Sequence, residues 1–440
     1  MKHWPAIVSA AVALAVAVPV LHELVPDCRL FERTQASSPT KVAPQAEPLE
    51  ILGSVEVDRM HVSDQVVTAP AGVGRVAHLT IDPPMQRLAD ASLKSRSIPY
   101  GAVVAMRVRT GEILAVASRR GGSKDDPVVS GAFPATDVFK LVTAKALLDE
   151  FGVTASTPVC YRDTGKKLGL AELAEDTNKD TWCPSLAEAM GRNLDAPFAR
   201  LALRHLDKER LERASLAFGL GADLSFDVPV ATGRVSIPDT ALGFVEAAIG
   251  VGQVTMSAMH GLLMASAVAN KGTMVRPVLV RKVEASGGKV VYRVPDGPRV
   301  ERLVMTPAVA EELSKMMSET TEIGEGFRAF HDDTGHPVLG DTKVAGVTGA
   351  ERVEQDAEQT TWFVGFAPVD DPDVVIATVV RNRRGASGNA QALAVDVLRG
   401  YVQFARQPDQ KPIRSSEFRS DELDATRLAA APLRMATGTR

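Results

Sequence analysis

The sequence predicts an α/β fold of the α+β type: an antiparallel sheet flanked by helices, with an α-rich subdomain. Two hairpin patterns lie far apart in the chain, over residues 101–118 and 361–380, and each joins two β-rich runs through a turn. The region between them is helical in pattern, and a terminal helix is expected over residues 389–405. We therefore expect a sheet assembled from both ends of the chain, with a helical insertion between its first and last strands.

Local signals justify the individual elements. Asp82 is followed by two prolines, which predicts a helix start because proline is favoured in the first helical turn. Thr110-Gly111 marks the turn of the first hairpin. Residues 138–150 are apolar almost all the way round, which is typical of a buried helix. Further helices are expected over residues 187–206, 238–249 and 255–270.

Composition changes along the chain predict its domain organisation. Residues 34–49 are rich in Pro, Ser, Ala and Gln, as in an extended tether, and residues 406–440 carry mixed charge with few large apolar side chains. We expect an anchor or signal segment over 1–25, a linker or short stalk over 26–75, one catalytic-sized domain over 76–405 and a disordered tail over 406–440.

Charge and cysteine content exclude several classes of protein. Lys and Arg total 50 against 54 Asp and Glu, a net charge of −4, so no basic excess favours nucleic-acid binding. Three cysteines are too few for a small disulfide-rich protein or a four-cysteine zinc site. We expect no nucleic-acid partner, no metal and no cofactor.

The N-terminal segment predicts where the protein works. Residues 4–21 are 18 consecutive uncharged positions, mostly Ala, Val and Leu. This length is the lower limit for crossing a bilayer and is long for the apolar core of a signal peptide. An uncleaved single-pass anchor in the inner membrane and a cleaved signal both remain open. Either one exports the rest of the chain to the periplasm or another extracytoplasmic space.

Export changes the interpretation of two cysteines. Cys160 and Cys183 lie 23 residues apart, on either side of a polar, loop-like stretch. In an oxidising compartment they could form a disulfide, and the alternative is two unrelated buried thiols. The sequence does not supply the Cα separation that decides between these alternatives.

Five strings, taken in chain order, resemble one family. TIDPPMQ at residues 80–86 resembles the TxDPxLQ entry to the transpeptidase domain of penicillin-binding proteins, and the first hairpin resembles that of the same domain. FPATDVFK at 133–140 is similar to the PGSxFK segment that holds the nucleophile. VAGVTGA at 344–350 and WFVGFAP at 362–368 resemble the AGKTGTA strand and its neighbour. The resemblance covers residues 76–405 and implies the serine D,D-transpeptidase or β-lactamase-like fold.

The chain departs from all three catalytic motifs of this family. The resemblance implies three motifs. In SxxK a lysine deprotonates a serine, SxN relays a proton and holds substrate, and KTG docks the substrate peptide. Here Asp137 stands three residues before Lys140, where serine is expected. Gly191 replaces the hydroxyl two residues before Asn193, and Val347 replaces the lysine before Thr348 and Gly349. Asn193, Thr348 and Gly349 remain as the implied substrate-binding positions.

The chemistry of these replacements predicts a lost active site. An aspartate that attacked an acyl donor would form an anhydride, which is too labile to serve as a stored acyl-enzyme. A carboxylate one helical turn from Lys140 also favours the ammonium form, which cannot act as a base. Asp137 and Lys140 are therefore expected to form a structural ion pair at the seam between the sheet and the α-rich subdomain.

These observations lead to a leading hypothesis, an enzymatic alternative and a third possibility, a purely structural stalk with no ligand. The leading hypothesis is a pseudoenzyme that binds peptidoglycan stem peptides or a partner protein of wall synthesis or cell division. The alternative is an active transpeptidase, carboxypeptidase or β-lactamase-like enzyme that uses Thr136. This residue lies four positions before Lys140 and so on the same helical face. Its simpler interpretation is a helix N-cap.

Overall fold

The computed structural model describes residues 48–405, apart from 163–167, 170–172, 253, 351–357 and 387. The expected anchor or signal segment and the expected C-terminal tail lie outside these residues. Within the described part of the chain, no helix combines the length and the apolar character that a membrane crossing requires.

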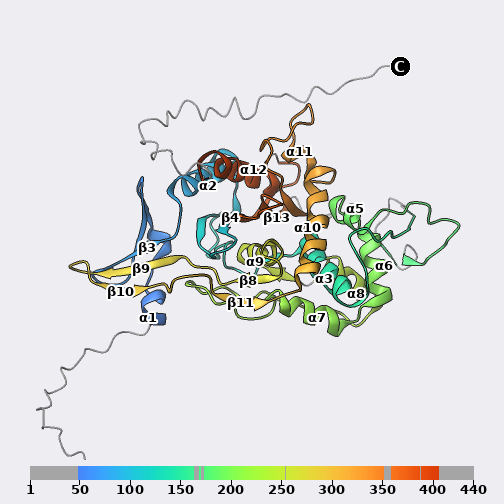
Figure 1. Cartoon of the computed structure of the whole chain (residues 1–440), viewed down its shortest axis with the longest axis horizontal. Coiled ribbons are helices and arrows are strands. Elements are labelled where there is room, and N and C mark those ends of the chain that lie inside the picture. The colour runs from blue at the N-terminus through green and yellow to red at the C-terminus, as the bar shows by residue number, and fades with distance from the viewer. Residues whose placement is uncertain are drawn as a thin grey trace, which may run out of the picture. The chain divides into compact units, whose positions relative to one another are not determined.

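The main sheet has five strands in the order β12-β13-β14-β4-β5, and every neighbouring pair is antiparallel. Two of these strands, β4 and β13, are labelled in Figure 1. Its bounds are β4 (Tyr100–Arg107), β5 (Ile113–Arg120), β12 (Ala345–Ala350), β13 (Glu358–Ala367) and β14 (Val374–Arg383). Strands from the early and late parts of the chain therefore meet at the β14–β4 pair, where Thr378 lies opposite Val103. The predicted assembly from both ends is confirmed.

Helices cover both faces of this sheet. Alternate strand residues point to opposite faces, so Val104 packs in one hydrophobic cluster and Val103 in the other. The Val103 face is covered by α2 (Pro83–Ser95) and α12 (Ala390–Gly400). The Val104 face is covered by α9 (Ala258–Ala269), which is buried along its whole length. Asp82 caps α2 by accepting a hydrogen bond from the backbone of Met85 at 2.9 Å.

The α-rich subdomain lies between the two halves of the sheet in the chain. A short 3-10 turn, η2 (Thr136–Phe139), leads into α3 (Lys140–Glu150). It is followed by α5 (Leu186–Gly191), α6 (Asp195–His205), α7 (Lys208–Ala217) and α8 (Ala241–Ala248). The single helix expected over residues 187–206 is wrong, because the chain breaks between α5 and α6 at Asn193, where φ is +56°. Later, α10 (Pro307–Glu322) packs against α5 and β12.

A second five-stranded sheet has the order β1-β2-β3-β9-β10. It is formed by β1 (His61–Val62), β2 (Val67–Pro70), β3 (Arg75–Leu79), β9 (Val280–Ala285) and β10 (Val290–Arg293). Much of the stretch that we expected as a linker, residues 48–75, is therefore folded. It also contains α1 (Pro48–Gly53) and η1 (Val57–Arg59).

The remaining elements are short. They are β6 (Phe133–Pro134), β7 (Thr255–Met256), β8 (Thr273–Val275), β11 (Val300–Leu303), α11 (Phe327–Phe330) and the π-helical turn η3 (Tyr401–Ala405). The pairing of β6 with β7 holds the chain just before η2, where the catalytic motif is expected.

Candidate functional site

The candidate site begins at the junction of η2 and α3. Asp137 and Lys140 are 3 % and 1 % exposed, and one helical turn brings their side chains to the same face. Lys140 Nζ lies 3.0 Å from Asp137 Oδ1. A charged pair this deeply buried is stable only when its other hydrogen-bonding positions are filled as well.

The ammonium of Lys140 is fully bonded. Besides Asp137, it donates to Asn193 Oδ1 at 2.6 Å and to Asp195 Oδ1 at 2.7 Å. An ammonium has three N–H donors, so these three acceptors use all of them. A protonated amine without a lone pair cannot take a proton from a hydroxyl, and this one has no donor left for a substrate.

Electrostatics favour the charged state of both partners. Burial alone would lower the pKa of Lys140, but the carboxylates of Asp137 and Asp195 outweigh it and the pKa lies above its ordinary value of 10.5. Burial alone would raise the pKa of Asp137, but the charge of Lys140 outweighs it and that pKa lies below its ordinary value of 3.8. At neutral pH the site therefore holds an ammonium and a carboxylate.

The break between α5 and α6 positions the other two acceptors. Asn193 adopts a left-handed backbone, which asparagine tolerates better than most residues, and its side chain is thereby directed at Lys140. Asp195 begins α6, where a carboxylate also interacts favourably with the helix dipole. Gly191, the position where the resemblance implies a hydroxyl, packs tightly against α10. A Cβ there would lie only 2.7 Å from the Cβ of Glu319, so serine does not fit without a shift of α10.

Strand β12 lies at the edge of the main sheet and closes the site. The backbone N–H of Ala350 donates to Asp137 Oδ2 at 3.2 Å, and Thr348 Oγ1 donates to Glu325 Oε2 at 3.1 Å. Val347 is 2 % exposed and packs in the hydrophobic cluster. Acyl transfer needs backbone donors that are available for a developing oxyanion. At Ala350 that donor is already used by the carboxylate of Asp137.

Thr136 is held in an unusual conformation beside this network. Its φ of +49° is left-handed, which is strained for a β-branched residue. Gly250 and Gly349 leave the room that it needs, because a Cβ on either glycine would overlap Thr136 atoms. The buried hydroxyl of Thr136 has no hydrogen-bond partner among the described residues. No hydrogen bond joins it to Lys140, whose three donors are directed elsewhere.

Asp137, Lys140, Asn193 and Thr348 therefore converge, as the resemblance implies. The structure adds Asp195 and Glu325, to which the sequence analysis gave no role. Asp195 had only a weak signal, as an acid two residues after Asn193. Glu325 lies between two glycines after a helix, and this pattern alone does not show what it contacts. In the parts of the chain that the structure describes, no group of three or more His, Cys, Asp or Glu side chains is placed to hold a metal ion.

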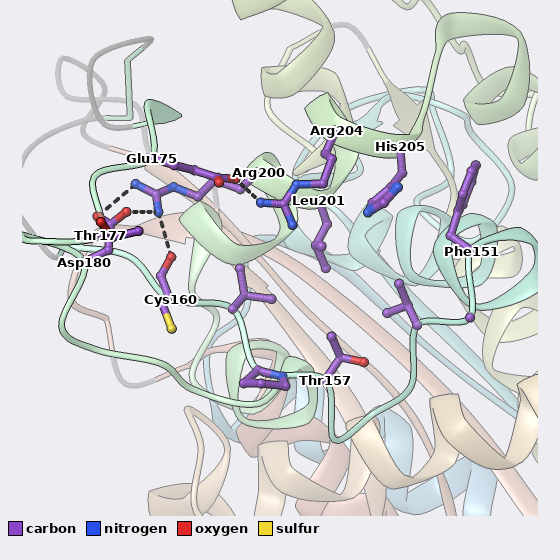
Figure 2. A pocket seen from close by; sticks show the side chains of 14 residues that line it. Phe151, Thr157, Cys160, Glu175, Thr177, Asp180, Arg200, Leu201, Arg204 and His205 are labelled. Carbon is purple, nitrogen blue, oxygen red and sulfur yellow. Dashed lines mark hydrogen bonds and ion pairs between the residues drawn. The ribbon is translucent and has the colours of Figure 1, made fainter.

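A separate cavity of about 520 Å³ lies at the other end of α3 and α6 (Figure 2). Its lining includes Phe151 and His205, whose rings are tilted by 33° with centroids 5.0 Å apart, but none of the residues that bond Lys140. On one wall, Arg200 donates to Asp180 at 2.7 Å and to the carbonyl of Cys160 at 2.6 Å (Figure 2). Cys160 is joined to Cys183 by a disulfide.

The sheet, the α-rich subdomain and the network at their seam define the architecture of a penicillin-recognising transpeptidase. The chain belongs to the penicillin binding protein transpeptidase domain family, whose model matches residues 101–399. This family is involved in peptidoglycan synthesis. The family resemblance and the fold class predicted from the sequence are confirmed.

Curated relatives and solved structures agree with this assignment. The chain is 24 % identical to the peptidoglycan D,D-transpeptidase PbpA of Mycolicibacterium smegmatis, covering 72 % of this chain and 70 % of that protein. It is 25 % identical to the stage V sporulation protein D of Bacillus subtilis, covering 70 % of this chain and 50 % of that protein. Its fold is similar to the crystal structure of PBPA from Mycobacterium tuberculosis, with a TM-score of 0.59 and 22 % identity over 74 % of this chain and 81 % of that one. The D,D-transpeptidase domain of a peptidoglycan glycosyltransferase from Eggerthella lenta gives a TM-score of 0.61, with 22 % identity over 74 % of this chain and 82 % of that one.

Proposed function

We propose that this protein is a catalytically inactive member of its family, which uses the former active-site cleft for non-covalent binding. The supporting observation is the saturated ammonium of Lys140, which has two carboxylates and an amide oxygen as acceptors. A base is missing, a hydroxyl is missing at position 137, and the backbone donor at Ala350 is already used. Because catalytic groups act as a unit, loss of any one of them would lower the rate by orders of magnitude.

The binding partner follows from the retained scaffold. The strand edge at β12 and the side chains of Asn193 and Thr348 remain in place around the cleft. We propose that the cleft binds wall stem peptides weakly, or a partner protein of wall synthesis or cell division. A muropeptide titration checks the first ligand, and saturable binding is the expected result. An absence of saturable binding would count against stem peptides as ligands and would favour a structural stalk with no ligand.

We also propose that the protein is tethered to the inner membrane by residues 4–21, with the domain outside the cytoplasm. The disulfide between Cys160 and Cys183 supports export, because disulfides persist in oxidising compartments. The intact mass of the protein extracted from membranes tests the tether. A mass that retains the N-terminal segment supports an anchor, and a mass that lacks it shows a cleaved signal.

Labelled penicillin tests the loss of catalysis. PBPA from Mycobacterium tuberculosis has been solved as a penicillin G acyl-enzyme and serves as the positive control. We expect no covalent adduct on this protein, and none on Asp137→Ser, because Gly191 and Val347 remain and serine cannot use a lysine that stays bonded to Asp195. An adduct on the wild type that disappears in Thr136→Ala would overturn the proposal and identify Thr136 as the nucleophile.

A further inference from the structure

A carboxylate of the protein itself lies beside β12, at the proposed binding site. Glu325 Oε2 accepts hydrogen bonds from Thr348 Oγ1 at 3.1 Å and from Asn193 Nδ2 at 3.4 Å. These two donors come from different parts of the chain, 23 residues after Glu325 and 132 residues before it. Two neutral donors that converge on one carboxylate oxygen form a small carboxylate-binding position.

The backbone around Glu325 is built to place this side chain. Its N–H donates to the carbonyl of Gly191 at 2.9 Å, which ties the loop after α10 to the end of α5. The preceding Gly324 is packed so closely that a Cβ there would overlap Gly191. The loop is thus fixed at its backbone. Glu325 itself is exposed to solvent, unlike Asp137, so its side chain can leave without uncovering a buried charge.

The charges around this position disfavour a second carboxylate. Lys140 is already shared between Asp137 and Asp195, and Val347 brings no charge to the strand. A ligand carboxylate that entered while Glu325 was in place would add negative charge next to existing carboxylates and would find both donors occupied. Such a ligand therefore has to displace Glu325 first.

We infer that Glu325 is a specificity-determining residue that fills this carboxylate-binding position and weakens the binding of peptides with a free C-terminal carboxylate. This inference rests on the proposed non-covalent binding function. It divides possible ligands into two classes. Peptides that end in a carboxylate compete with Glu325, whereas ligands that present a neutral group at this position, such as a capped peptide, do not.

Peptide binding to Glu325→Ala tests the inference. The probes are an acylated Lys-D-Ala-D-Ala tripeptide and the same tripeptide with a C-terminal amide, both measured by calorimetry. We expect Glu325→Ala to bind the carboxylate form about tenfold more tightly than the wild type, since one hydrogen-bonded internal competitor is removed. Affinity for the amide form should be unchanged. Glu322→Ala is the matched control, because Glu322 is an exposed glutamate only three residues away and should leave both affinities unchanged.

The other outcomes overturn the inference. Equal affinities of wild type and Glu325→Ala for the carboxylate peptide, or an equal gain for both peptides, would show that Glu325 does not act as an internal carboxylate ligand. Glu325→Gln guards against a folding defect, since it keeps the side-chain volume and removes only the charge; it should shift the carboxylate affinity in the same direction. The penicillin experiment is independent, because a covalent adduct would refute the inactive cleft whatever the peptides show.

Discussion

Two buried cations, one bonded to the first residue of α6 and one within that helix, are neutralised in different ways. The side chain of Lys140 is 1 % exposed and that of Arg200 is 2 % exposed. Arg200 is bonded to Asp180 and to the carbonyls of Cys160 and Ala174, all of which belong to one loop region next to the disulfide. Lys140 instead donates hydrogen bonds to Asp137 in η2, to Asn193 at the α5–α6 break and to Asp195, the first residue of α6.

The comparison shows what the proposed loss of catalysis would mean for Lys140. Arg200 fastens a loop to a helix, which is an ordinary structural role. Lys140 stands where the resemblance places the catalytic base, yet it has the same physical environment, a buried cation with every donor satisfied. It differs in that its partners come from two separate segments, Asp137 and residues 193–195, and outnumber it in charge, two carboxylates to one ammonium. In this structure Lys140 joins η2 to the start of α6.

The largest expected effect comes from removing the cation. Lys140→Met leaves the buried carboxylate of Asp137 without its counter-ion and should lower the free energy of unfolding by about 3–5 kcal/mol. Lys145→Met, on the same helix, removes a less buried pair with Asp149 and should cost about 1 kcal/mol. Urea unfolding measures both. Equal losses would show that Lys140 is no more structural than its neighbour.

A smaller effect is expected from the disulfide beside the loop that Arg200 holds. Replacing Cys160 and Cys183 together by serine should lower the free energy of unfolding by about 2–4 kcal/mol, because the unfolded chain regains the freedom of the closed loop. Peptide binding at the Glu325 cleft should not change, since none of its residues belongs to this loop. A loss of binding that accompanied the loss of stability would show that the disulfide loop and the Glu325 site are coupled.

The smallest effect is the pH dependence of the Asp137 contribution. Because the folded pKa of Asp137 lies below 3.8, its contribution to stability is present above pH 3.8 and is lost as the pH falls through the lowered value. Asp137→Asn should cost about 1–2 kcal/mol at pH 6, since Asp195 still neutralises Lys140. Unfolding curves of the two proteins should converge in strong acid. A difference that persists there would assign the effect to packing instead of charge.

Local sequence signals predicted much of the fold. The two hairpins, the Asp82 cap and the buried helix after residue 138 depend on neighbours in the chain, and the structure contains all of them. The Asp137–Lys140 contact is also local, since it depends only on helical spacing. The single helix over 187–206 was wrong because Asn193 leaves the helical conformation to reach Lys140, 53 residues before it. A tertiary hydrogen bond thus overrode local helix propensity.

Long-range contacts account for what the sequence did not predict. Alternation over residues 55–67 is strand-like, but it does not show that β1, β2 and β3 join a second sheet, which depends on the pairing of β3 with β9, with Val76 opposite Glu284, about half the chain away. Asp195 and Glu325 likewise reach the site from distant segments, and each could serve as an ordinary surface acid. Only their contacts with Lys140, Asn193 and Thr348 in the structure distinguish them from the other 52 of the 54 acidic residues of the chain.

The protonation state of Lys140 tests the central claim most directly. Proton–nitrogen NMR of the lysine ammonium groups, with Lys140→Met to assign the signal, follows this amine through a pH titration. We predict that the Lys140 ammonium persists at pH 10.5, where half of an ordinary lysine population is deprotonated. A neutral Lys140 amine near pH 7 would contradict the account, because the base that the family's chemistry requires would then still be present.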